Sequence, residues 1–346
     1  DTIQMLNFLS SLFTPHSAER PEALDDALIE KATERVVLGT DQRIRAVRDY
    51  QNILREPVVK AAVHVITLVD ALPPPVVISP QAFSEDEVIR ALFVSKEHLS
   101  KVLGGFNSVN DYLQDLSVLP PDDIYGLMTV TKDERTVFGM ALEGEDLRRD
   151  VMQVSVNFSN HRYVGPADNE VDSRRELKKC AFDFLIEKSL ERITGKRSKR
   201  LVLDRQKHLL QQKLDAMKSG KWGLGTMLDE VEGISPNLAA LETKIEAIDD
   251  ELGQFPSDKF GLVESLDCVI ETLSNPADWL ASAKICLRLD YRGIKVPESS
   301  SAPSTEINLT ELISGTGQRR TVIFGRIARA DIPEPANIWE SAKHYY

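Results

Sequence analysis

The glycine-rich segment 220–227 contains the residue types of a phosphate-binding loop. Glycines at 220, 223 and 225 lie beside Lys221 and Thr226, and such loops hold phosphate with main-chain N–H groups, a lysine and a hydroxyl. A Walker A loop, however, needs Lys and then Ser or Thr directly after its second spaced glycine, whereas Thr226 and Met227 follow Gly225 here. We therefore interpret the segment as a turn between two helices, and we predict no cofactor.

Candidate metal ligands are scattered along the chain. The six histidines include no HxxxH or HExxH pair, so no local motif places two imidazoles on one face of a helix. The acidic segment 168–172 does not continue as a calcium loop, because Ser173 and Lys179 occupy the positions that need Gly and Glu. We predict no metal site.

The densest polar group near the end of a predicted strand surrounds His161. Its members are Asn157, Asn160, His161, Arg162 and Tyr163. An imidazole beside hydrogen-bonding side chains is a candidate general base, but no nucleophile stands in a recognisable elbow nearby. An enzyme of unassigned reaction with its site at this sheet edge is therefore one hypothesis, and a polar turn is the alternative interpretation.

The densest basic run consists of Lys196, Arg197, Lys199 and Arg200. Clustered Lys and Arg bind phosphate by releasing counterions, so nucleic-acid binding through this run is a second hypothesis. The run has no interleaved aromatic residues for base stacking, and the whole chain has a net charge of −12. These observations favour a solvated helix face or pairing with acidic residues over a nucleic-acid partner.

Trp222 lies in the glycine-rich turn together with Leu224 and Met227. Tryptophan is enriched among the residues that anchor protein interfaces, so these three side chains are candidate partner-binding residues. In the alternative interpretation, Trp222 packs on its apolar neighbours and closes the end of the turn.

The secondary structure that must position these residues changes from helical to β-type along the chain. Residues 1–118 have helical spacing, with expected helix ends at Gly39 and Pro73, a kink or a new helix at Pro57, and expected caps at Ser84 and Ser95. β-type alternation then begins. We predict a hairpin of strands 127–131 and 136–142 joined by residues 132–135, then a strand over 151–158 and a turn at 159–160.

A long helical region follows the first strands. Residues 174–217 contain no proline, and Leu238, Leu241, Ile245, Ile248 and Leu252 have the alternating 3,4 spacing of a coiled coil. Residues 174–221 have a net charge of +9, whereas residues 229–264 have −8. The complementary charges predict a projecting antiparallel helical hairpin.

β pattern resumes over 285–291, 307–313 and 320–327, the last two joined by a turn at 314–318. The predicted fold is α+β, with a mainly antiparallel sheet interrupted by a coiled-coil-like helical hairpin. The predicted domains are a helical domain 1–118, a split β domain 119–172 with 284–346, and an inserted hairpin 173–283.

The sequence predicts no membrane span. Its longest apolar region, residues 58–72, is short and contains Lys60 and Asp70. The first residues lack a basic region and an initiator methionine, which is typical of a trimmed or processed start. Cys180, Cys268 and Cys286 form no CxxC pair, and cysteines without a disulfide pattern favour a reducing, cytoplasmic compartment.

The motifs assign no enzymatic activity and identify no family. The architecture favours a non-enzymatic protein-interaction or scaffold protein, because a projecting helical hairpin exposes side chains to a partner or to a second copy. The enzyme near His161 and the nucleic-acid binder are the alternatives.

Overall fold

The computed structural model describes residues 26–115, 120–143, 146–218, 238–253, 255, 261–297 and 302–333. The chain divides into two compact units. A sheet unit comprises Asp1–Ala23, Ala61–Asp183 and Asn275–Tyr346, and a helical unit comprises Leu24–Lys60 and Phe184–Ser274. Residues 24–60 thus group with the later helices, and the predicted domain boundaries stay a prediction.

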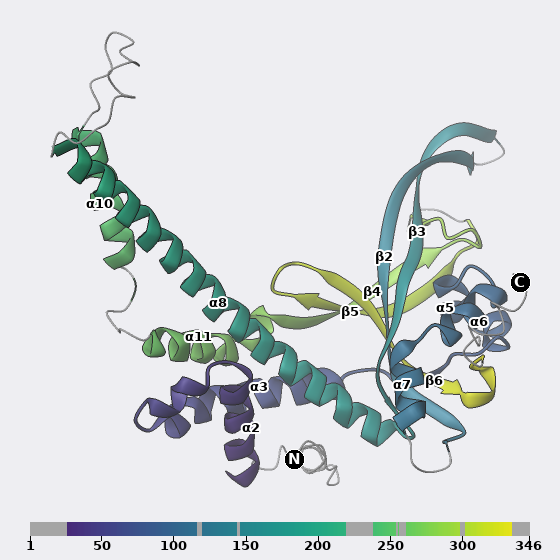
Figure 1. The fold of residues 1–346 in the computed structure, drawn as a ribbon. Coiled ribbons are helices and arrows are strands. Elements are labelled where there is room, and N and C mark those ends of the chain that lie inside the picture. Colours follow the sequence, from purple (N-terminus) through teal and green to yellow (C-terminus); the bar gives the residue numbers. More distant parts are fainter. Residues whose placement is uncertain are drawn as a thin grey trace, which may run out of the picture. The chain divides into compact units, whose positions relative to one another are not determined.

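The sheet unit is built on one mainly antiparallel sheet (Figure 1). Its strands are β1 (Val76–Val77), β2 (Asp123–Glu143), β3 (Asp146–Ala167), β4 (Leu280–Leu289), β5 (Thr305–Ser314) and β6 (Arg319–Ala328). The order is β3-β2-β6-β5-β4, and β1 pairs parallel with β6. Strands from before and after the long helical region thus share one sheet, as predicted.

Strand β2 differs from the predicted hairpin. It runs without a turn through residues 132–135, which pair with residues 155–158 of β3. The prediction of a turn there was wrong: residues 132–135 contain no Gly or Asn, which supply the positive φ of tight hairpin turns. The turn predicted at 159–160 is also absent, since β3 continues through Asn160, whose φ of 53° accompanies a shift in register.

Short helices pack against the sheet. They are α4 (Ala82–Glu85), α5 (Glu87–Leu92), α6 (Lys96–Gly104) and α7 (Asn107–Asp115). Ser95 caps α6 as predicted, whereas the helix predicted to start at Ser84 is instead capped at Asp86, which accepts hydrogen bonds from Val88 N and Ile89 N. Leu92, Phe93 and Leu99 join strand residues in one buried core.

The helical elements continue along the chain as α2 (Asp26–Gly39), η2 (Gln42–Ala46), α3 (Tyr50–Asp70), α8 (Glu170–Lys218), α10 (Leu238–Gly253) and α11 (Leu262–Ser274). Helix α2 ends at Gly39 as predicted, and α3 continues through Pro57, so no new helix begins there. Helices α3 and α8 contribute residues to both units. Two short 3₁₀ turns, η3 (Pro276–Asp278) and η4 (Arg329–Asp331), lie in the sheet unit.

Candidate protein-interaction surface

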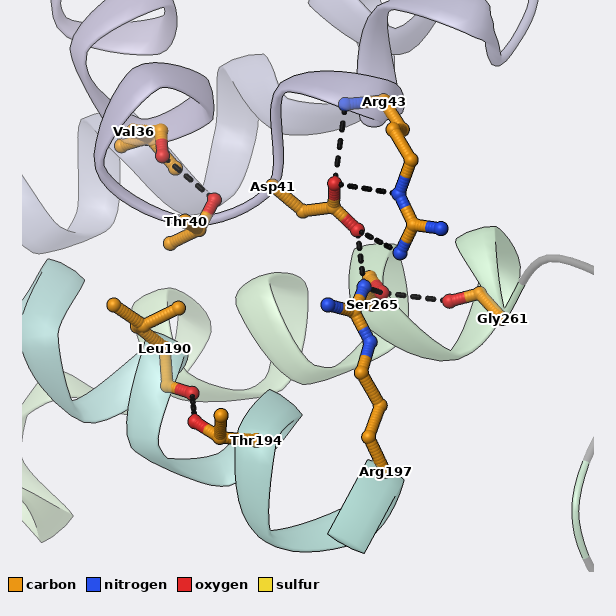
Figure 2. Close-up of polar contacts among 9 residues, drawn as sticks. All are labelled: Val36, Thr40, Asp41, Arg43, Leu190, Thr194, Arg197, Gly261 and Ser265. Atoms are coloured by element: carbon orange, nitrogen blue, oxygen red, sulfur yellow. Dashed lines mark hydrogen bonds and ion pairs between the residues drawn. The ribbon is translucent and has the colours of Figure 1, made fainter. Parts of the chain in front are cut away.

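A buried carboxylate in the helical unit fixes the position of one residue of the basic run (Figure 2). Arg43 Nε and Nη2 donate to Asp41 Oδ1 and Oδ2, each at 3.0 Å. Arg197 forms a further ion pair with Asp41, and its Nη2 donates to Ser265 Oγ at 2.8 Å. The carboxylate therefore connects the turn after α2 to α8, and Arg197 extends this connection to α11.

The ionisation of Asp41 is consistent with this arrangement. Its side chain is 7% exposed, and burial by itself raises the pKa of a carboxyl group. Hydrogen bonds from Arg43 and Arg197 outweigh that effect and lower the pKa of Asp41 to about 2. The carboxylate is thus charged at neutral pH and pairs with two guanidinium groups.

Other residues of the basic run also face groups of the same unit. Lys199 Nζ lies 2.6 Å from Glu251 Oε1 on α10. Lys196 lies near the fully buried Cys268, where burial raises the pKa of the thiol and the lysine charge partly opposes that effect. Arg200 is half-buried. The structure therefore places Arg197 and Lys199 in intramolecular ion pairs and does not gather the run into an open basic patch.

Two more ion pairs join α8 to α10 along their length. Lys207 Nζ lies 2.5 Å from Asp249 Oδ1, and Lys218 Nζ lies 2.8 Å from Glu242 Oε1. Lys199 and Glu251 form the third pair of this series. From one pair to the next, the residue number increases on α8 and decreases on α10. The two helices are therefore antiparallel over this stretch, and Figure 1 shows α10 beside the distal part of α8.

Three large aliphatic side chains of α8 are more than half exposed. Leu201 is 69% exposed, Val202 55% and Leu209 56%. Val202 and Leu209 are seven residues apart and therefore lie on one face of the helix. Buried Leu203 and half-buried Leu210 lie on a different face. We call Leu201, Val202 and Leu209 the outer stripe of α8.

The candidate partner-binding residues Trp222, Leu224 and Met227 lie outside the described residues. Their assignment stays a prediction. The outer stripe, in contrast, was not singled out from the sequence. The i to i+7 spacing of Val202 and Leu209 is a visible signal, but it cannot tell an exposed face from a buried one.

The structure separates the polar group around His161. His161 Nε2 lies 2.9 Å from the Leu92 carbonyl oxygen, and its ring stacks on Phe93 at a centroid distance of 4.8 Å. Burial lowers the pKa of His161, and the nearby His98 lowers it further, although the Leu92 carbonyl opposes the shift. Since a carbonyl only accepts, Nε2 is the protonated nitrogen. The His161 ring is thus hydrogen-bonded to the last residue of α5. Because its partner is a main-chain carbonyl, this contact is not a pair of a nucleophile and a general base.

Tyr163, predicted in the same group, belongs to the core instead. Its ring covers Gly126, where an added Cβ would lie 2.3 Å from a ring carbon. Its hydroxyl lies 2.9 Å from the Gly325 carbonyl oxygen and 3.1 Å from that of Ile124. Burial raises the pKa of Tyr163. Tyr163 therefore holds neighbouring strands together.

Within the ranges that the structure describes, no cluster of three His, Cys, Asp or Glu side chains is arranged to hold a metal ion. No helix in the same ranges is long and apolar enough to cross a membrane. Comparisons with protein-family models, curated proteins and solved structures find no match for this chain. The functional argument therefore depends on the surfaces themselves.

Proposed function

We propose that this chain is a non-enzymatic protein-interaction or scaffold protein in which α8 and α10 form a helical hairpin that binds a protein partner or a second copy. The observation that carries the proposal is the outer stripe of α8. Three exposed aliphatic side chains within nine residues of one helix form an apolar surface that burial against a partner would stabilise.

Burial along α10 supports the hairpin. Leu241, Ile245, Ile248 and Leu252 are half-buried, whereas most residues between them are exposed. They occupy four of the five positions with coiled-coil spacing, and the ion pairs from α8 flank this side of α10. A two-helix seam covers only one side of each helix, so the outer stripe is left available to another molecule.

The charges favour a protein partner over nucleic acid. Lys199, Lys207 and Lys218 pair with acidic residues of α10, and Arg197 pairs with Asp41. Binding to a phosphate backbone needs cations that are free to replace counterions. An apolar stripe with i to i+7 spacing is instead typical of a helix that docks into the groove of another protein.

A capture experiment tests the proposal. The full chain, a Val202→Asp/Leu209→Asp variant and an Asp204→Lys control are immobilised and exposed to lysate of the source cells. Asp204 is also exposed on α8 but lies on the opposite side of the helix from Val202 and Leu209. We expect proteins that the wild type and the control retain to be lost from the double variant, with unchanged circular dichroism.

Two results would contradict this function: no specifically retained protein and no self-association of the wild type, or equal retention by all three forms. In either case the outer stripe is ordinary exposed surface. Replacing residues 220–233 by a short neutral turn separately tests the predicted contribution of Trp222, Leu224 and Met227.

A further inference from the structure

The two edges of the sheet differ in how they are covered. At the outer edge of β3, Val156 N donates to the Gly293 carbonyl oxygen and Lys295 N donates to the Val154 carbonyl oxygen, each at 2.8 Å. At the opposite edge, every residue of β4 pairs with β5 without a shift in register. No strand of the described ranges runs along the other side of β4. The main-chain groups of β4 therefore decide whether this edge is open.

Hydrogen bonds at both ends of β4 show which of its residues point away from β5. The Trp279 carbonyl oxygen, just before β4, accepts a hydrogen bond at 3.0 Å from the main chain just after β5. Because main-chain groups alternate along an antiparallel strand, odd-numbered residues of β4 face β5 and even-numbered residues face outward. Accordingly, the outward carbonyl oxygen of Leu280 lies 2.7 Å from His64 Nε2, and that of Arg288 accepts from Val296 N at 2.8 Å. Both ends of the outer edge are thus closed.

Three outward-facing residues remain between the closed ends: Ser282, Lys284 and Cys286. Within the described part of the chain, their main-chain N–H and C=O groups have no hydrogen-bond partner. Their side chains are exposed, so the edge is accessible. We call residues 282–286 the open edge of β4. An unpaired row of N–H and C=O groups is complementary to the main chain of another extended segment, and this row has room for a segment of about five residues.

The side chains around the open edge specify the character of that segment. Ala283 and Ile285 share one face of β4, and Ile285 packs against the hydrophobic core. Lys284 lies on the opposite face; it is exposed and forms no ion pair within the described ranges. An added strand continues both faces of the sheet. Apolar residues of that strand would then adjoin Ile285, and an acidic residue beside Lys284 would form a favourable cross-strand pair.

We infer that the open edge of β4 binds an extended, acidic segment of a partner protein as an additional strand. Main-chain hydrogen bonds supply the affinity in this mode of recognition, and the side chains supply the specificity. Lys284 provides that specificity, because an acidic segment neutralises its charge. The open edge lies in the sheet unit, so the inference is independent of the proposed function of α8 and α10.

A second copy of this chain fits the open edge less well. An antiparallel pair of two open edges that uses all three outward residues places Lys284 directly opposite Lys284 of the second copy. Like charges in that position destabilise a strand pair. Shifting the register by two residues moves part of each edge against the closed end at Leu280 or Arg288. Lysine on an edge strand prevents such self-pairing, and here the same charge favours an acidic partner.

Hydrogen exchange of the full chain, followed by NMR, tests the inference. The probe is a capped peptide of alternating valine and glutamate, added in excess. In the free chain, the outward amides of Ser282, Lys284 and Cys286 should exchange rapidly, and the peptide should slow their exchange about tenfold or more. The amides of Ala283 and Ile285 face β5, so their exchange should stay unchanged and serves as the internal control.

Matched peptides and variants separate main-chain pairing from charge. A fully N-methylated form of the peptide cannot donate hydrogen bonds and should give no protection. The same peptide with lysine in place of glutamate should bind about threefold or more weakly. Lys284→Glu should reverse this preference, and Lys284→Gln should abolish it while keeping the main-chain edge. Val202→Asp/Leu209→Asp, on α8, should bind the glutamate peptide like the wild type.

The inference is wrong if no peptide protects the outward amides, if the N-methylated peptide protects them equally, or if the glutamate and lysine peptides bind alike. It is also wrong if these amides are already protected in a free chain that sedimentation shows to be a dimer, since a second copy is then the occupant. Circular dichroism checks the fold of each variant, and Lys284→Gln alone tests the preference if Lys284→Glu is unfolded. None of these failures affects capture through the outer stripe of α8, so the two proposals are distinguished.

Discussion

Arg197, a member of the densest basic run in the chain, forms an ion pair with the buried carboxylate of Asp41, 156 residues away in the sequence. Arg43 holds the same carboxylate from within the turn after α2. A residue that resembles a ligand for phosphate in the sequence is thus part of the internal framework of the helical unit.

Removing the Arg197 guanidinium should destabilise the protein. In Arg197→Met, Asp41 keeps Arg43 but loses a charged hydrogen-bond donor, so we expect the free energy of unfolding to fall by about 2 kcal/mol. Lys199→Met is the matched control from the same run: its pair with Glu251 is half-exposed and should contribute about 1 kcal/mol or less. Urea unfolding measures both values, and equal effects would contradict the structural role of Arg197.

Asp41 should also make stability depend on acid pH. Its pKa is 3.8 in the reference state and about 2 in the folded chain. Above pH 3.8 the carboxylate is ionised in both states and its full stabilisation is present; as the pH falls toward 2, the unfolded chain binds the proton first and that stabilisation is lost. Urea unfolding from pH 5 downward should show a shallower acid loss for Asp41→Asn than for the wild type. Parallel profiles would contradict the assignment.

His161 should make stability depend on pH in a higher range than Asp41 does. Its pKa in the folded chain lies below the reference value of 6.5, because burial disfavours the imidazolium. Its stabilisation is therefore complete above pH 6.5 and decreases as the pH falls and the unfolded chain becomes protonated. NMR titration of the imidazole should give a midpoint below 6.5, and His161→Gln should flatten the unfolding profile in this range. A midpoint at or above 6.5 would contradict the burial of the ring.

Local patterns in the sequence predicted much of the fold. The helix over residues 238–252, the cap at Ser95 and the turn at 314–318 depend on neighbours within a few residues, and the structure contains each of them. The continuous strand β2 was missed because four charged residues resemble a turn, whereas in β2 each of them pairs with a residue of β3. Strand β1 was missed because a two-residue pairing with β6 has no periodic signal.

The surfaces were harder to predict, because they depend on register and long-range contacts. The outward direction of the Lys284 main chain follows only when the pairing of β4 with β5 is known. The Asp41–Arg197 pair likewise follows from the packing of distant helices. Charge complementarity between the two helical arms was visible in the sequence because it is a property of whole segments, and three ion pairs now join α8 to α10.

The antiparallel pairing of α8 and α10 can be tested by exchanging one pair of charges. Lys207→Glu places a second negative group beside the Asp249 carboxylate. It should destabilise the protein by about 0.5 to 1 kcal/mol, since the pair is partly exposed. Asp249→Lys should have a similar effect. The double variant restores an ion pair of reversed polarity, so its free energy of unfolding should return close to that of the wild type.

Asp250 provides the control for this cycle. It is exposed on α10 and, as the residue directly after Asp249, it points about 100° away around the helix, so Asp250→Lys combined with Lys207→Glu should show no comparable recovery. Urea unfolding of the single and double variants gives the coupling energy directly. A coupling energy of zero between positions 207 and 249 would contradict the antiparallel pairing, and with it the hairpin on which the proposed partner surface depends.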